Sequence, residues 1–295
     1  MAEKGEKVDG FHRLSTLWKI DYEVEALEPL LTGAAYEEAK EDVSDLLGKE
    51  LPKTEPDAVP LFIEDRAVIT GNAVKGVFRH IISAQLTEAG QKVCVQEIKL
   101  RKGVNAQKLG RIESCEPDNP CQVCKWFGTG GRRSSRKQDS DEQDSGRSSS
   151  GRQGALYFSM LVSRESIKDV LMKEPIPMVA LSEDTNAMIA GRGEGRFAVL
   201  VAVKKGTIFS GWITGDNLDE AAIGAIKEIQ DISEKGFLKF GGFKTRGFGS
   251  VKMRVKSVEK YRAAPFSLEK KYEGEELADF LKICQEAYHR LLTKV

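Results

Sequence analysis

The feature that most restricts how this chain can fold is the order of its apolar patterns. Residues 17–27 alternate apolar and polar side chains, which is typical of a strand with one buried face. Residues 70–86 and 216–235 instead place apolar side chains three and four positions apart, which predicts two amphipathic helices. Between the helices, the apolar runs at 155–162 and 207–214 are expected to form buried strands.

A strand at 249–258 completes the order strand, helix, strand, strand, helix, strand. This order predicts an α+β fold of the ferredoxin-like (RRM-like) type, whose four-stranded sheet is a frequent scaffold for RNA binding. A last helix is expected at 275–293. Thr70 or Asn72 is available as the N-cap of the first helix, and Gly236 is placed to end the second.

The charge of the chain is balanced overall but sorted along its length. There are 45 Lys and Arg residues and 45 Asp and Glu residues, so total charge predicts no partner. Residues 33–66 nevertheless carry ten acids against four bases, whereas residues 241–256 carry five bases and no acid. No apolar run approaches the roughly 18 residues needed to span a bilayer, and the charged N-terminal tail lacks a signal-peptide core. We therefore expect a cytoplasmic protein without a membrane partner.

Two segments read as insertions into this plan. Residues 128–153 contain twelve Gly or Ser residues among twenty-six, six Lys or Arg residues and no aliphatic side chain, so we expect a disordered insertion there. The acidic, proline-containing stretch that precedes residue 60 is expected to be a long surface excursion, with a short helix near 39–47.

Three of the five cysteines crowd into ten residues: Cys115, Cys121 and Cys124. The Cys-x2-Cys spacing allows two thiolates to bind one Zn²⁺ from a tight turn, so the group predicts a structural zinc site and not a disulfide. The fourth ligand is left to His80 or Cys94, and the sequence favours His80 because it lies at the edge of the apolar stripe of its helix. An ordinary surface histidine remains the alternative for His80.

The segment 240–251 interleaves four glycines with Lys244, Thr245 and Arg246. Glycines let a backbone approach a ligand closely, and the cations suit a phosphate, so the segment predicts a loop that binds a nucleic-acid backbone. Its spacing matches neither common nucleotide-phosphate motif, and a plain glycine-rich turn is the other alternative. Two further cations lie one turn apart on the polar face of the first helix: Lys75 and Arg79.

Taken together, these motifs resemble the RAMP superfamily, specifically the repeated backbone subunit of type III CRISPR effector complexes. Four motifs carry the resemblance in the family's order: ITGNAVKGVFR at 69–79, the cysteine group ending in CKWFG, EDTNAMIAG at 183–191, and GGFKTRGFGSV at 241–251.

The resemblance implies a single domain over residues 1–295, with a ferredoxin-like palm whose first half and zinc knuckle lie in 17–127 and whose second half lies in 206–258. It implies a thumb hairpin at 183–205. It also implies that copies stack head to tail along a guide CRISPR RNA, together with other type III subunits. In this arrangement Lys75, Arg79, Lys244, Thr245 and Arg246 contact RNA, Met188 and Ile189 wedge between bases, and Arg192 and Arg196 bind phosphates.

The same resemblance implies a catalytic role for Asp57, which matches an aspartate in the loop after the family's first strand. A carboxylate there could hold Mg²⁺ or Mn²⁺ against the scissile phosphate of a complementary target RNA. From the residues alone, Asp57 is one solvated acid among ten. Three functions therefore stay open, ranked as follows: a metal-dependent endoribonuclease backbone subunit, a binding-only scaffold of the same architecture, and a standalone enzyme that processes CRISPR precursor RNA.

Overall fold

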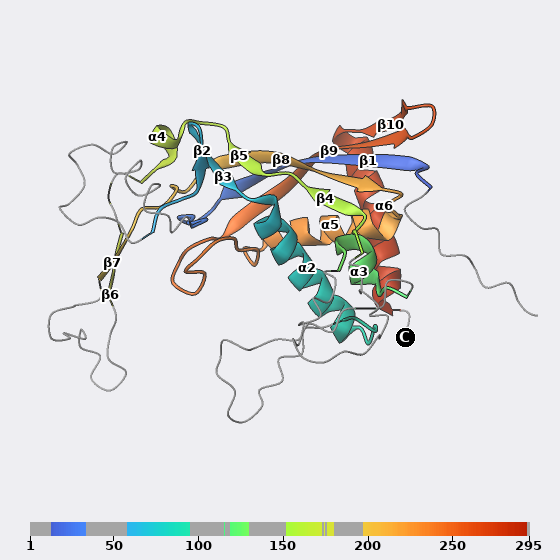
Figure 1. Ribbon diagram of the computed structural model, residues 1–295, viewed down its shortest axis with the longest axis horizontal. Coiled ribbons are helices and arrows are strands. Elements are labelled where there is room, and N and C mark those ends of the chain that lie inside the picture. Colours follow the sequence, from blue (N-terminus) through green and yellow to red (C-terminus); the bar gives the residue numbers. More distant parts are fainter. Residues whose placement is uncertain are drawn as a thin grey trace, which may run out of the picture.

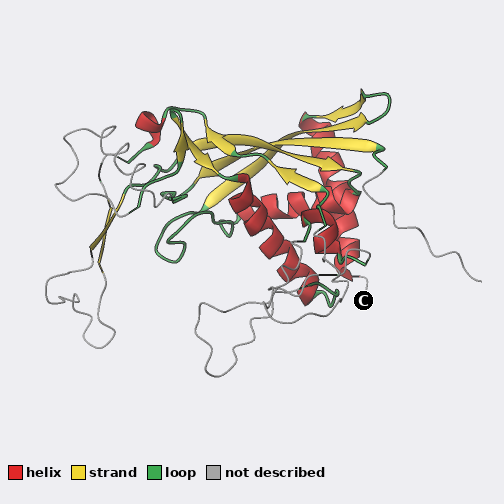
Figure 2. Ribbon diagram, in the orientation of Figure 1, coloured by secondary structure: helices red, strands yellow, loops and turns green. Residues whose placement is uncertain are grey.

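The computed structural model shows an antiparallel sheet with helices packed mainly against one of its faces (Figures 1 and 2). It describes residues 13–33, 58–94, 115, 119–129, 152–172, 174, 176–179 and 197–293. Within these residues, eight strands form the main sheet and two more form a separate hairpin.

Strand β1 (Thr16–Ala26) lies in the middle of the sheet, antiparallel to β8 (Ile208–Asp216) on one side and to β9 (Val251–Arg262) on the other. Its even-numbered residues from Trp18 to Ala26 are buried, and the odd-numbered residues between them are more exposed. Successive side chains of a strand point to opposite faces, so this alternation determines which face carries the core. The predicted first strand is confirmed.

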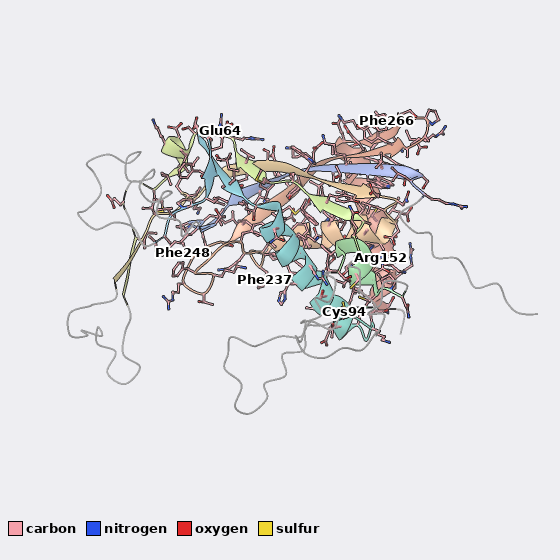
Figure 3. All side chains as sticks on the ribbon, viewed as in Figure 1. Glu64, Cys94, Arg152, Phe237, Phe248 and Phe266 are labelled. Atoms are coloured by element: carbon pink, nitrogen blue, oxygen red, sulfur yellow. The ribbon has the colours of Figure 1, made fainter. Side chains whose placement is uncertain are left out.

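The remaining strands extend the sheet to both sides. Beyond β9 lies the edge strand β10, and beyond β8 come β5, β3 and β2 in that order, with β4 also paired to β8. Glu64, in the turn between β2 and β3, and Phe266, between β9 and β10, mark opposite ends of the sheet (Figure 3). The bounds of these strands are Phe62–Ile63 (β2), Arg66–Ile69 (β3), Leu156–Phe158 (β4), Leu161–Ser163 (β5) and Ser267–Tyr272 (β10).

Three long helices cover the buried face: α2 (Gly71–Glu88), α5 (Glu220–Glu234) and α6 (Gly274–Thr293). The side chain of Thr70 caps α2 by accepting a hydrogen bond from the amide of Ala73, so Thr70 and not Asn72 is the N-cap. The apolar stripes of all three helices are buried in one continuous core with the inner face of the sheet. Two short helices are also present in the described residues: α3 (Gln122–Phe127) and α4 (Ile167–Val170).

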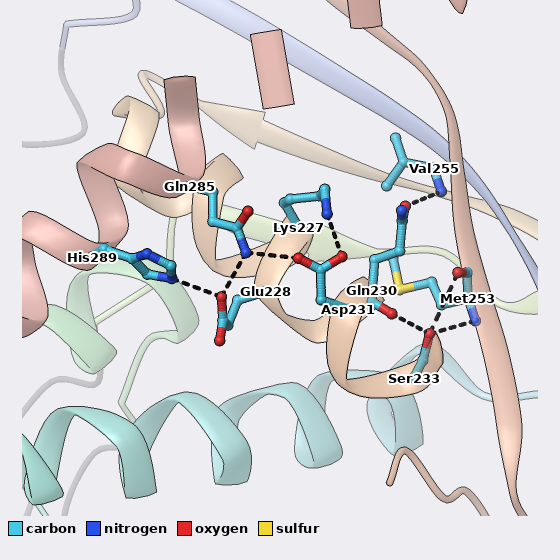
Figure 4. A network of polar contacts seen from close by, with 9 residues as sticks. All are labelled: Lys227, Glu228, Gln230, Asp231, Ser233, Met253, Val255, Gln285 and His289. Carbon is cyan, nitrogen blue, oxygen red and sulfur yellow. Dashed lines mark hydrogen bonds and ion pairs between the residues drawn. The ribbon is translucent and has the colours of Figure 1, made fainter. Parts of the chain in front are cut away.

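Helices α5 and α6 approach each other most closely at Gly224. A Cβ atom at this position would lie 2.0 Å from the carbonyl oxygen of Cys284, so only glycine permits the observed packing. Polar contacts flank this point (Figure 4): Gln285 donates hydrogen bonds to Glu228 and Asp231, both at 2.7 Å. Gly224 therefore permits the short distance between α5 and α6, and the hydrogen bonds of Gln285 fix how the two helices are aligned.

A second group of polar contacts joins α5 to strand β9 (Figure 4). The hydroxyl of Ser233 accepts a hydrogen bond from the amide of Met253 at 2.9 Å, and the side chain of Gln230 accepts one from the amide of Val255 at 2.9 Å. Ser233 is fully buried, so its hydroxyl has a partner where water is excluded.

One predicted strand is broken in two. The sequence predicts one strand at 155–162, but β4 and β5 are separated at Ser159 and Met160. The amide of Ser159 donates to the carbonyl of Trp212, and the Ser159 hydroxyl accepts from the Trp212 amide at 2.8 Å. These contacts hold an extra residue against β8, which is the arrangement of a β-bulge.

The other predicted strands and helices lie where the apolar patterns place them, whereas the elements not predicted include β2, β3, β10, α3 and α4. The expected helix near 39–47 lies outside the described residues. Of the insertion predicted at 128–153 only the ends are described, and there Thr129 and Arg152 form an antiparallel bridge. No helix in the described part of the chain is long and apolar enough to cross a membrane.

Candidate functional site

Four cysteines gather beside the C-terminal end of α2. The sulfur atoms of Cys94, Cys115, Cys121 and Cys124 all lie within 4.8 Å of one another. Cys121 is the N-cap of α3 and Cys124 lies in its first turn, so one short helix supplies two of the sulfurs. The amide of Cys121 also donates a hydrogen bond to the sulfur of Cys115 at 3.3 Å, a contact that stabilises a thiolate.

Cys94 reaches the cluster because α2 ends in a tight turn. The amide of Gly90 bonds to the carbonyl of Thr87 and the amide of Gln91 to that of Leu86, with Gly90 at φ +73°. This is a Schellman motif, which reverses the chain directly after a helix.

The electrostatics of the cluster favour one ionised sulfur. A side-chain hydrogen bond with Cys124 lowers the pKa of the Cys121 thiol well below its usual value. The same contact, together with burial, raises the pKa of Cys124, and burial raises that of Cys115. The cluster therefore favours a thiolate, the form of cysteine that binds a metal ion.

The donor set fits a structural zinc ion. Four cysteine sulfurs form a closed tetrahedral Zn²⁺ site, whose sulfur atoms are about 3.8 Å apart at a Zn–S distance of about 2.3 Å. The sulfurs of Cys94 and Cys121 are 3.8 Å apart, and those of Cys94 and Cys124, which share a thiol hydrogen bond, are 2.9 Å apart. The four cysteines could thus hold a metal such as zinc with little rearrangement.

The structure corrects the predicted fourth ligand. His80 is exposed on α2 and is not part of the cluster, whereas Cys94, the alternative left open by the sequence, completes it. His80 lies in the middle of the helix, and the cluster forms beyond the helix end, where only the reversed chain can reach. A glycine that ends a helix shortly before a cysteine is the sequence signal that favours Cys94.

The glycine-rich segment forms a braced loop between α5 and β9. A Cβ atom at Gly241 would lie 2.2 Å from the carbonyl oxygen of Leu31, and one at Gly249 would lie 2.2 Å from that of Phe240. Both glycines also have positive φ, +76° and +87°. The amide of Gly242 donates to Leu31, so the loop is pinned to the segment that follows β1. Glycine is required here for close backbone approach.

The predicted phosphate-binding residues lie at the tip of this loop. Lys244, Thr245 and Arg246 are exposed. Lys239, at the base, forms an ion pair with Glu28 at 3.2 Å and donates to the Lys244 carbonyl at 3.2 Å. Lys239 thus supports the loop, while the cations at its tip face solvent.

A small apolar cluster underlies the loop and joins it to four segments that are distant in the sequence. It contains the buried residues Leu31, Leu200, Ala202 and Phe248, with Ala58, Met172, Ile176 and Phe243 packed against them. Ile176 and Leu200 belong to the hairpin strands β6 (Ile176–Val179) and β7 (Phe197–Leu200), which pair antiparallel. Ala58 forms a bridge with Leu200. The residue after Asp57, the base of the hairpin and the glycine-rich loop therefore meet in one place.

The two predicted cations of α2 differ in their surroundings. Arg79 donates a hydrogen bond to the carbonyl of Gly128 at 2.7 Å and so holds the chain where it leaves α3. Lys75 is partly buried, and this burial, followed by the charge of Arg79, lowers its pKa. An anion between these two cations would relieve their repulsion.

Five predicted site residues lie outside the described residues: Asp57, Met188, Ile189, Arg192 and Arg196. The predictions for these five residues therefore stay predictions. The structure does describe Ala58, which follows Asp57, and the strands β6 and β7, which precede and follow the other four residues in the sequence.

Comparison with known proteins adds one match. A family model described as the RAMP superfamily matches residues 23–252. No curated protein matches the chain significantly. The matched residues begin within β1 and end within β9, so they include the four cysteines and the whole glycine-rich loop.

Proposed function

The chain belongs to the RAMP superfamily, and from this membership we propose that it is the repeated backbone subunit of a type III CRISPR effector complex. It binds guide RNA, stacks against further copies of itself and other subunits, and cleaves complementary target RNA. The observation that carries the proposal is the glycine-rich loop, whose backbone is braced and whose cations Lys244 and Arg246 are exposed. Such contacts bind phosphates and hold RNA of any sequence, as a guide carrier requires.

The arrangement of the sheet supports a ferredoxin-like palm. The strands β1, β8 and β9 and the pair β4–β5 are antiparallel neighbours in the order β9, β1, β8, β5, and α2 and α5 connect them on one face. The β6–β7 pair supports a thumb that contains Met188, Ile189, Arg192 and Arg196 between its strands. In the proposal, the apolar pair wedges between bases of the guide–target duplex and the arginines bind its phosphates.

Cleavage is assigned to Asp57, acting with Mg²⁺ or Mn²⁺. The support is positional: Ala58 packs in the same small cluster as the glycine-rich loop and the hairpin base. Asp57 directly precedes Ala58 in the sequence, and in this proposal it acts on the RNA that the loop binds. It could position a divalent cation against the scissile phosphate or help to activate the ribose 2′-hydroxyl.

The four-cysteine cluster holds a structural Zn²⁺ in this proposal. A closed set of four sulfurs leaves no open coordination position for substrate, so the ion stabilises the fold and takes no part in cleavage. Lys75 and Arg79 add to the phosphate contacts from the first helix of the palm.

A cleavage assay tests the nuclease assignment. The assembled complex carries either the native subunit or Asp57→Ala, and the guide-complementary RNA is offered with Mg²⁺ or with a chelator. We expect evenly spaced, metal-dependent products that disappear with Asp57→Ala while guide binding is retained. Intact target despite tight binding by the native complex would make the chain a scaffold. Cleavage of the guide precursor by the isolated chain would favour the processing enzyme.

A binding assay tests the loop separately. Lys244→Ala with Arg246→Ala should weaken binding of single-stranded RNA and reduce the slope of log K against log salt by about one per lost phosphate contact. Lys282→Ala with Arg290→Ala removes the same charge from exposed positions on α6 and should leave both quantities unchanged. Equal losses in the two double variants would contradict a specific role for the loop.

A further inference from the structure

Phe237 is the most exposed large apolar side chain in the described part of the chain, with 76% of its surface open to solvent. It lies directly after α5 and Gly236, at the start of the segment that leads into the glycine-rich loop. Exposing a phenylalanine ring forfeits the free energy of burying it. Single exposed apolar side chains are common on protein surfaces, so a function for Phe237 has to be inferred from its backbone and its neighbours. The function proposed above does not use this residue.

The backbone of Phe237 is fixed although its ring is exposed. Its amide donates to the carbonyl of Ile232, the amide of Gly236 donates to that of Ser233, and Gly236 has φ +80°. These bonds define a Schellman motif at the end of α5, in which the residue after the glycine usually packs its apolar side chain back onto the helix. Here the ring is exposed to solvent, although the hydrogen-bonded turn that carries it is fixed.

This support belongs to the base of the glycine-rich loop. The hydroxyl of Ser250 donates to the carbonyl of Gly236 at 3.3 Å, and the amide of Val251 donates to that of Leu238 at 3.0 Å. The two sides of the loop are thus paired directly beside Phe237, and Figure 3 shows Phe237 next to this part of the chain.

The charged residues that follow α5 in the sequence, on either side of Phe237, are basic. Lys235 precedes it and is exposed, Lys239 follows it, and Lys244 and Arg246 lie at the loop tip. Among the acids of this region, Glu28 is paired with Lys239, and Glu234 lies on the last turn of α5.

The lack of other exposed apolar side chains near Phe237 in the sequence favours a base over a protein as the partner of the ring. Within residues 219–262, all of them described, Phe237 is the only exposed large apolar side chain. The centre of a protein interface is formed by several clustered apolar side chains, whereas one aromatic ring beside cations is the usual platform for a nucleic-acid base.

We propose that Phe237 is a stacking platform for one base of single-stranded RNA whose neighbouring phosphates are bound by the glycine-rich loop. The proposal rests on the RNA binding proposed above and adds the group that contacts a base. Stacking accepts any base, because every base has a π face, so it fits a protein that carries guides of many sequences. The fixed backbone reduces the entropy lost when the ring becomes ordered against the base.

The test measures binding of a fluorescently labelled single-stranded RNA to the purified full-length chain over a range of salt concentrations. Phe237→Ala should weaken binding about fivefold or more, with the salt slope unchanged because no phosphate contact is lost. Phe237→Trp should bind at least as well as the native protein. Phe237→Leu, which keeps the apolar character and removes the ring, should resemble Phe237→Ala.

Two controls make the result specific. Phe266→Ala removes another exposed ring, 68% open to solvent, beyond the opposite end of β9, and should leave RNA affinity unchanged. Inorganic polyphosphate carries charge but no bases, so native protein and Phe237→Ala should bind it equally. Equal RNA affinity of native protein and Phe237→Ala would overturn the proposal. RNA binding by Phe237→Leu at the native affinity would also overturn it. So would a loss of polyphosphate affinity in Phe237→Ala as large as its loss of RNA affinity.

The failure of this proposal can be told apart from the failure of the proposed function. If Lys244→Ala with Arg246→Ala loses RNA and Phe237→Ala keeps it, only the stacking platform is wrong. If the lysine–arginine double variant binds RNA as the native chain does, the loop itself is misassigned, and both proposals fall.

Discussion

At the scale of single residues, the cysteine cluster shows which part of a site a sequence can specify. The Cys121–Cys124 spacing is local, so the sequence predicts that both sulfurs serve one metal, and the structure brings them together. The fourth position depends on where the chain turns after α2, which is a property of the Schellman motif at Gly90 and not of spacing. His80 lies at the edge of the apolar stripe of α2, but the turn after α2 places Cys94, and not His80, beside the other three cysteines.

The assignment of Cys94 leads to a paired prediction. Cys94→Ser should lower the zinc content of the purified protein, because a serine hydroxyl is a much poorer zinc ligand than a thiolate. His80→Ala should leave the zinc content at that of the native protein, since His80 is exposed and outside the cluster. Zinc can be measured by release to a chromogenic chelator after denaturation. Full zinc in Cys94→Ser and loss in His80→Ala would reverse the assignment.

At the scale of helices and strands, the contact between α5 and α6 depends on one missing side chain. Gly224→Ala places a Cβ atom 2.0 Å from the backbone of Cys284, so the helices must separate. Overpacking of this kind costs about 1–3 kcal/mol, and we expect a loss of that size in the free energy of unfolding. Gly76→Ala on α2 is the matched control. Its Cβ meets nothing within 4 Å, so higher helix propensity should stabilise the protein by about 0.5–1 kcal/mol.

Denaturant unfolding of both variants measures the contrast. Equal changes in the free energy of unfolding for the two variants would show that helix propensity alone determines the effect of alanine. The close approach of α5 and α6 would then not constrain the fold.

The same scale shows how much of the fold could be predicted. Long periodic segments were predicted well: β1, α2, α5 and α6 begin and end close to the expected residues. The break between β4 and β5 was missed, because a bulge at Ser159 is fixed by its hydrogen bonds to Trp212 across the sheet and leaves the apolar pattern intact. β10 was missed because its residues are almost all exposed, so it has no buried face to produce an alternating pattern.

At the scale of the whole molecule, the two candidate sites lie apart and have different tasks. Figure 3 shows Cys94 beside the far end of α2 and Phe248, a residue of the glycine-rich loop, well separated from it. The cluster is tied to the helical layer: Gln91 donates to the carbonyl of Leu291 on α6 at 3.1 Å, and Trp126 of α3 packs against Tyr288. A metal there would join the segment after α2 to α3, both of which contact α6 through the residues just named. The glycine-rich loop is held instead by the strand end and by the small cluster beneath it.

This separation predicts that removing the metal affects stability and leaves RNA binding almost unchanged. A chelator added to zinc-loaded protein should lower the melting temperature by roughly 4 °C or more, since an ion bound only by the folded state stabilises it and ~2 kcal/mol corresponds to such a shift. Added zinc should restore the melting temperature, and the melting temperature of Cys121→Ser should not respond to chelator.

At a temperature where the metal-free protein remains folded, its affinity for single-stranded RNA should stay within about twofold of the zinc-loaded value, because the phosphate contacts of the loop are intact. A parallel collapse of RNA affinity in the folded, metal-free protein would show that the cluster positions the loop, and the two sites would then have to be treated as one.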